Sequence, residues 1–83
     1  MDVRGQIRSY IIENFLFGDT TPLTGDDLSL LDSGIIDSVG VMELVAYLEN
    51  DHSLTIADDE LVPENLDSVD NLVKFVTRKH SVV

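Results

Sequence analysis

The chain has 83 residues, no cysteine and a formal net charge of −11 at pH 7, from 16 acidic and 5 basic side chains. Its length and its hydrophobic content of 43% suffice for one small domain, residues 1–83, without a deep active-site cavity. The absence of cysteine excludes disulfides, Cys-based metal sites and a thiol nucleophile supplied by the chain itself.

The first predicted element is a helix from about residue 3 to residue 17, because apolar residues recur at helical spacing and Gly18 supplies a stop. The apolar positions are Val3, Ile7, Tyr10, Ile11 and Phe15. A connection rich in Gly, Pro, Thr and Asp then runs to about Asp37. Since so long a loop is unexpected in a compact domain, we expect its apolar patch to dip into the core. That patch consists of Leu28, Leu30 and Leu31.

Two further helices complete the expected fold. One starts at Ser38, ends near Asn50 and has the i, i+3, i+4, i+7 pattern of Val41, Leu44, Val45 and Leu48. A loop follows, with one short helical turn around Asp58 to Leu61 that Pro63 ends. The last helix starts at Ser68 and ends among the cations Lys74, Arg78, Lys79 and His80, which complement the helix dipole. No strand alternation is present, so the sequence predicts an all-α bundle of three main helices and one short helix.

For two sets of apolar residues, both packing and binding are considered. Val39, Met42 and Ala46 form a second stripe on the helix that starts at Ser38, which we expect to line the core; a contact used by partner proteins is the alternative. We also expect the aromatic residues to be packing residues rather than a ligand site. These are Tyr10, Phe15, Phe17, Tyr47 and Phe75.

The dipeptide Asp-Ser occurs three times, and local chemistry partly distinguishes the three serines. Ser33 precedes Gly34, and this pair between apolar residues is typical of a turn. Ser68 opens a helix, where its hydroxyl serves as an N-cap. Ser38 also precedes a helix and has a simple interpretation as an N-cap. However, Gly40 weakens the first turn and indicates access or flexibility, and a helix N-terminus favours a phosphate group.

The segment LDSGIIDSVGVMELVAYL, Leu31 to Leu48, resembles the modification region of acyl carrier and peptidyl carrier proteins. The order of helices and the acidity resemble that family along nearly the whole chain. The resemblance implies that Ser38, preceded by Asp37, receives a covalent 4′-phosphopantetheine arm donated from coenzyme A. Glu43 matches a commonly acidic position, and Leu44 follows it as in the family. The arm would supply the thiol that this chain lacks and hold an acyl or aminoacyl group as a thioester.

The sequence departs from many fatty-acid carriers around this serine. Those carriers have Gly three residues before it and Leu after it, whereas this chain has Ile35 and Val39. Gly34 and Gly40 instead give the spacing G-x-x-D-S-x-G. This spacing resembles D-alanine carrier proteins and other free-standing carriers loaded by a separate adenylating ligase. An aminoacyl carrier is therefore an alternative to a housekeeping fatty-acid carrier.

The charge distribution predicts the partners. Residues 9–73 contain 15 of the 16 carboxylates and no Lys or Arg, so the chain repels nucleic acid and attracts basic surfaces. The resemblance implies a phosphopantetheinyl transferase, an acyl- or aminoacyl-activating ligase, and synthase or acyltransferase enzymes with basic docking surfaces. We expect salt-sensitive docking beside Ser38. The expected contact residues are Val39, Met42, Glu43, Glu49, Asp58, Asp59 and Glu60.

Other classes of function fit less well. His52 and His80 are the only histidines. A Ser-His-Asp triad that uses Ser38 and His52 is not expected, because the two residues are 14 positions apart with a helix between them. We therefore expect no catalytic residues and no enzyme. The acidic loops lack the ligand pattern of an EF-hand, and we expect no metal site. No stretch approaches the roughly 18 apolar residues of a membrane span, so we expect a cytoplasmic protein. We expect a monomer, because that is the default for a carrier that shuttles a tethered group. The serious alternative is an unmodified acidic helical module for protein interaction.

Overall fold

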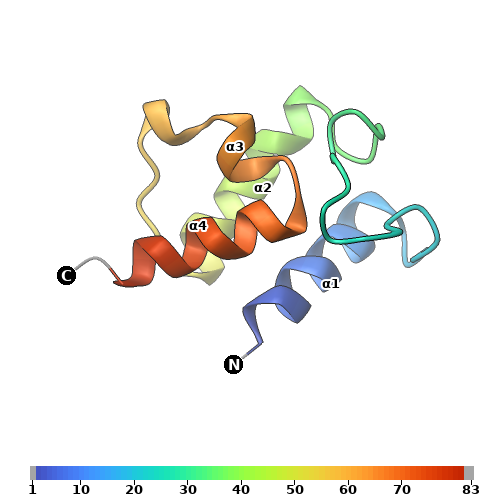
Figure 1. Cartoon of the computed structure of the whole chain (residues 1–83), viewed down its shortest axis with the longest axis horizontal. Coiled ribbons are helices and arrows are strands. Elements are labelled where there is room, and N and C mark those ends of the chain that lie inside the picture. The colour runs from blue at the N-terminus through green and yellow to red at the C-terminus, as the bar shows by residue number, and fades with distance from the viewer. Residues whose placement is uncertain (1, 82–83) are drawn as a thin grey trace.

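The computed structural model describes residues 2–81, and within this range all regular structure is helical. The elements are α1 (Val3–Phe15), α2 (Ser38–Asp51), the 3-10 turn η1 (Asp58–Glu60), α3 (Pro63–Leu66) and α4 (Val69–Ser81) (Figure 1). The all-α bundle of three main helices and one short helix is therefore confirmed for these residues. Residues 1, 82 and 83 of the expected domain lie outside the described range.

The helices share one hydrophobic core. α4 contacts both α1 and α3, and its Phe75 is fully buried. Ile7 and Ile11 face the core from α1, as predicted, and Leu44 and Leu48 face it from α2. Each of these side chains transfers apolar surface out of water, which is the dominant favourable term in folding.

α1 ends two residues earlier than predicted. Asp2 caps its start by accepting a hydrogen bond from the Gly5 amide at 3.1 Å. At its end, Phe17 and Gly18 both adopt positive φ angles, 53° and 87°, which end the helix after Phe15. The prediction that Phe17 packs is wrong, because this reversal turns its side chain outward and leaves it 92% exposed.

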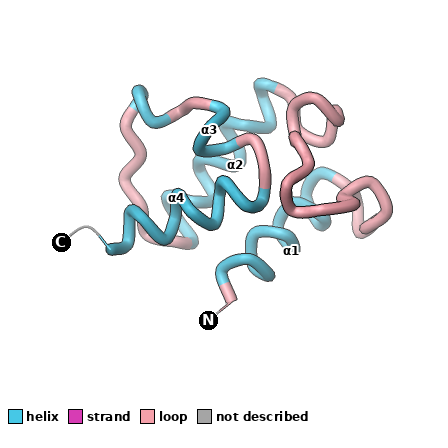
Figure 2. Tube along the Cα trace, in the orientation of Figure 1, coloured by secondary structure: helices cyan, strands magenta, loops and turns pink. Residues whose placement is uncertain are grey.

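The long connection before α2 is held to the start of α4 by Asp67. The Asp67 carboxylate accepts hydrogen bonds from the Ser29 hydroxyl at 2.6 Å and from the Leu31 amide at 2.9 Å. The Asp67 carbonyl accepts a third hydrogen bond, at 2.7 Å, from the amide of Leu30. Leu30 enters the core, as predicted, but Leu31 is 39% exposed because the turn directs it outward. Figure 2 shows this connection as the long pink segment that folds back to α2.

In the second half of the chain, the prediction for Pro63 is wrong. Pro63 begins α3 instead of ending a helical turn, because proline lacks the N–H that the first helical position does not need. At the end of α4, His80 Nε2 donates a hydrogen bond at 2.6 Å to the carbonyl of His52. His52 itself ends α2 and is buried, so this bond ties the end of α4 to the end of α2.

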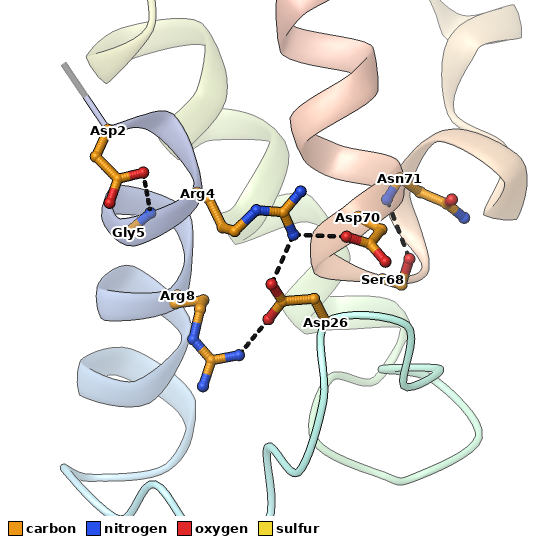
Figure 3. Close-up of polar contacts among 8 residues, drawn as sticks. All are labelled: Asp2, Arg4, Gly5, Arg8, Asp26, Ser68, Asp70 and Asn71. Atoms are coloured by element: carbon orange, nitrogen blue, oxygen red, sulfur yellow. Dashed lines mark hydrogen bonds and ion pairs between the residues drawn. The ribbon is translucent and has the colours of Figure 1, made fainter.

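Ion pairs fasten α1 to the loop and to α4. Arg4 donates to the Asp26 carboxylate at 2.6 Å and to Asp70 at 2.5 Å, and Arg8 donates to the other oxygen of Asp26. Figure 3 shows Asp26 between the two arginines, with Asp70 approaching from α4. Burial acts against the charged form of Asp26, but the hydrogen bonds from Arg4 and Arg8 lower its pKa below the ordinary value of 3.8. Asp26 is therefore ionised in the folded protein at neutral pH.

Asp26→Asn should lower the free energy of unfolding at neutral pH by about 1 to 2 kcal/mol, because both arginines lose a charged partner. Since the folded pKa of Asp26 is lowered, its contribution is fully present above the unfolded value of 3.8 and is lost as the pH falls through the folded value. The difference in urea midpoint between the two proteins should therefore shrink below about pH 4. A difference that stays constant to lower pH would contradict the role of the ionised carboxylate.

Candidate functional site

The first turn of α2 is capped by Asp37 and not by Ser38. Asp37 has extended backbone angles, φ −101° and ψ −175°, and its Oδ1 accepts a hydrogen bond from the Gly40 amide at 2.7 Å. Ser38 is the first residue of the helix itself. The simple interpretation of Ser38 as an N-cap is therefore wrong, because the aspartate before it performs that role.

The three Asp-Ser serines differ in what their hydroxyls do. The Ser33 hydroxyl donates to the carbonyl of Leu30 at 3.2 Å, and the Ser68 hydroxyl accepts from the Asn71 amide at 3.1 Å as the predicted cap of α4. Ser38 is exposed, and no group within residues 2–81 forms a hydrogen bond with its hydroxyl. Only Ser38 of these three therefore presents a hydroxyl that no local contact occupies.

The start of α2 also fits a phosphate group. Asp37 satisfies the amide of Gly40 through its side chain and the amide of Val41 through its carbonyl, at 2.7 and 2.9 Å. The amides of Ser38 and Val39 have no such partner among the described residues, and they lie at the positive end of the helix dipole. Two amide donors beside an exposed hydroxyl match what an anionic group attached to Ser38 requires.

Gly40 is needed for close packing of α2 against α1, a role that the sequence did not indicate. A Cβ atom at this position would lie 2.8 Å from Cε1 of Phe15 and 3.1 Å from Cγ2 of Ile36. Both distances are shorter than ordinary contacts between carbon atoms. Gly40 thus brings the start of α2 directly against the end of α1 and fixes where Ser38 stands.

The second apolar stripe of α2 does not line the core. Val39 is 70% exposed, Met42 is 58% exposed and Ala46 is exposed as well. The preferred prediction of core lining is wrong, because Leu44, Val45 and Leu48 already occupy the side of α2 that meets the bundle. The stripe lies instead on the surface of the helix that Ser38 begins.

The acidic residues expected to contact partners are placed differently from one another. Glu43, Asp58 and Asp59 are exposed. Glu49 is exposed, but its Oε2 accepts a hydrogen bond at 3.2 Å from the Ile56 amide. Glu60 is half-buried, and a hydrogen bond from Lys79 at 2.8 Å, followed by one from the Ala57 amide, lowers its pKa. Glu60 therefore has a structural role in holding η1 to α4.

Catalysis by Ser38 and His52 is excluded by their distance. They lie at opposite ends of α2, about 20 Å apart at 1.5 Å per residue. His52 Nε2 is also engaged, at 3.0 Å, with the hydroxyl of Tyr47. Burial lowers the pKa of His52, and Asp51 opposes that effect. His52 therefore acts in packing, at the far end of the helix from the serine.

Residues 2–81 contain no group of three or more His, Asp or Glu side chains that could hold a metal ion. No helix in this range is long and apolar enough to cross a bilayer.

Comparison with known proteins gives a family match and several relatives. Residues 14–76 match the family model described as the phosphopantetheine attachment site. The chain is 30% identical to the D-alanyl carrier protein of Streptococcus gordonii over 77 residues, which cover 93% of this chain and 94% of the relative. It is 27% identical to the D-alanyl carrier protein of Streptococcus mutans over 77 residues, with the same two coverages. For the D-alanyl carrier protein of Streptococcus suis, the identity is 30% over 76 residues, 92% of each chain.

The matched region contains both the long connection and the whole of α2, and the relatives extend the likeness over nearly the full length. The fold, the acidity and the match agree with the resemblance inferred from the sequence. Carriers of this kind work with partner enzymes such as ligases and transferases. The chain therefore belongs to the phosphopantetheine-attachment family and is a carrier protein that bears a covalently attached 4′-phosphopantetheine.

Proposed function

We propose that Ser38 is the attachment point of the phosphopantetheine arm. The observation that carries this proposal is its exposed, unengaged hydroxyl at the first position of α2, next to the cap residue Asp37. Asp37 orders the first turn, Gly40 seats that turn against α1, and the amides of Ser38 and Val39 remain for the phosphate. When bound, the arm supplies the thiol that holds the cargo as a thioester, since the chain has no cysteine.

We propose an aminoacyl cargo, loaded by a separate adenylating ligase. Two observations favour it over a fatty acyl cargo: the spacing of Gly34 and Gly40 around Ser38, and the D-alanyl carrier proteins among the relatives. D-alanine is accordingly the first acid to test. On this proposal residues 1–83 are one carrier domain that catalyses no reaction, and they work in the cytoplasm as a monomer beside the enzymes that supply coenzyme A and activated acid.

We propose further that partners dock on the exposed side of α2 and on η1. Val39 and Met42 offer an apolar centre on this side, and Glu43, Asp58 and Asp59 offer exposed negative charge for basic residues of a transferase or ligase. An apolar centre with a charged rim is the usual anatomy of a transient interface. Its charges chiefly increase the rate of association, so docking should weaken as salt is added.

Incubating the chain with coenzyme A and a broad-specificity phosphopantetheinyl transferase should add the mass of one phosphopantetheinyl group, located on the peptide that contains Ser38. The holo protein is then incubated with ATP, its adenylating ligase and a panel of acids. It should gain one aminoacyl group in preference to a fatty acyl group. Intact-mass spectrometry measures both steps.

The two steps separate the alternatives. If the chain gains no mass with the transferase while a known carrier in the same tube does, the acidic interaction module becomes the better account. If the arm attaches and only fatty acids load, Ser38 stands and the aminoacyl cargo is wrong.

A further inference from the structure

A shallow groove of about 640 Å³ runs between α1 and α2, away from Ser38. Tyr47 lines it and follows Ser38 by nine residues, about two and a half helical turns, so the two side chains leave α2 on opposite sides. The groove is thus separate from the attachment point. Its lining includes Gln6, Tyr10, Glu13, Asn14, Tyr47 and Asp51.

One wall of the groove is a fixed aromatic stack. The rings of Tyr10 and Tyr47 lie 3.9 Å apart between centroids and 11° from parallel. The Tyr10 hydroxyl donates to the carbonyl of Glu43 at 3.1 Å, and the Tyr47 hydroxyl donates to the carbonyl of Gln6 at 3.3 Å. Because both hydroxyls are bonded to backbone of the neighbouring helix, the rings are held in place before any ligand arrives.

All the charged side chains that line the groove are acidic. Its lining includes the carboxylates of Glu13 and Asp51, both exposed, and no Lys or Arg. The arginines of α1 are directed elsewhere, because Arg4 and Arg8 pair with Asp26. The pKa values of both tyrosines are raised, first by burial and then by nearby carboxylates, Glu43 and Asp51 for Tyr10 and Asp51 for Tyr47. This direction agrees with a site that favours a cation.

We propose that this groove binds the guanidinium group of an arginine carried by a partner enzyme. A guanidinium stacks on an aromatic face through its plane and offers a fork of donors to carboxylates, whereas an ammonium offers only a point charge. The stacked rings provide the aromatic contact. The carboxylates of Glu13 on α1 and Asp51 on α2 provide the hydrogen-bond acceptors.

α2 contributes residues both to the groove and to the proposed docking surface, since Tyr47 of the groove directly follows Ala46 of the exposed stripe. We expect a partner seated on that stripe to reach the groove with one basic side chain. The proposal does not require Ser38 to be the attachment point, so it can be tested on the unmodified chain.

The test is an NMR titration of the ¹⁵N-labelled apo chain with N-acetyl-arginine amide at low salt, compared with the lysine and citrulline amides. Arginine should shift the backbone amides of Gln6, Tyr10, Tyr47 and Asp51. The affinity of the double variant Glu13→Gln/Asp51→Asn for arginine amide should fall about fivefold. The matched control Asp32→Asn/Glu64→Gln removes two exposed carboxylates elsewhere and should change the affinity less than about twofold.

Selective shifts by arginine, lost only in the groove variant, support the proposal. Equal binding of lysine amide, equal losses in the two double variants, or shifts spread over all acidic segments would each overturn it. Repeating the titration on the holo chain adds a further outcome: if attachment of the arm itself shifts the groove amides and blocks arginine, the groove belongs to the arm and the proposal is wrong. Ser38→Ala should bind arginine amide as the wild type does.

Discussion

Ser38→Ala should abolish attachment of the phosphopantetheine arm completely while leaving the stability of the apo protein almost unchanged. Both halves of this expectation follow from the first turn of α2. The hydroxyl would be the nucleophile that forms the phosphate ester, and alanine has none. The capping bond, however, is made by Asp37 to Gly40, so removal of the Ser38 hydroxyl should change the free energy of unfolding by less than about 0.5 kcal/mol.

The other two Asp-Ser serines are the matched controls. Ser68→Ala should cost about 1 kcal/mol, because it removes the cap of α4, and should still accept the arm. Ser33→Ala should change little in either measurement. Thermal unfolding gives the stabilities, and intact mass after incubation with the transferase gives the modification. Modification of the Ser38→Ala chain would place the attachment point elsewhere, and a loss of about 1 kcal/mol in that variant would restore Ser38 as a cap.

Gly40→Ala should destabilise the protein by about 1 kcal/mol, and Gly40→Leu by about 3 kcal/mol, as overpacking does. Helix propensity alone predicts the opposite sign, since alanine is favoured over glycine by up to about 1 kcal/mol within a helix. The structure decides for destabilisation because the new Cβ would meet Phe15 at 2.8 Å and Ile36 at 3.1 Å. Phe15 also packs edge-on against Tyr10, at 5.8 Å between centroids, which restricts its retreat.

Ala46→Gly is the control for propensity in the same helix. Ala46 is exposed, so this variant reports the intrinsic cost of glycine, up to about 1 kcal/mol, without a packing change. Denaturant unfolding of the three variants separates the two effects. If Gly40→Ala were stabilised by the amount that Ala46→Gly loses, close contact between α1 and α2 would not explain the glycine.

The elements that were predicted correctly are those fixed by local pattern. The apolar repeats of α1, α2 and α4 mark their core faces directly, because a helix returns the same side every 3.6 residues. The cap at Ser68 and the turn at Ser33 followed from chemistry within three or four residues. The start of α2 at Ser38 was also correct, although the neighbouring aspartate makes the capping bond.

The predictions that failed depend on contacts between segments distant in the sequence. A helical repeat does not say how wide a strip of the helix its neighbours cover, so the stripe of Val39 and Met42 was assigned to the core although it is exposed. Gly40 could be understood only once Phe15 was known to lie against it. The stack of Tyr10 on Tyr47 joins residues on two helices, and no local signal in the sequence marks it.

The ion pairs of the fold also determine how the molecule turns in an electric field. Arg4 and Arg8 are neutralised by Asp26 and Asp70, and Lys79 is neutralised by Glu60, so these cations do not offset the exposed carboxylates of α2 and η1. The exposed carboxylates of α2 and η1 leave charge unevenly distributed over the surface of the protein, so a positively charged partner exerts a torque on it during approach. A carrier that must meet several enzymes in turn would thus arrive with α2 already facing each of them.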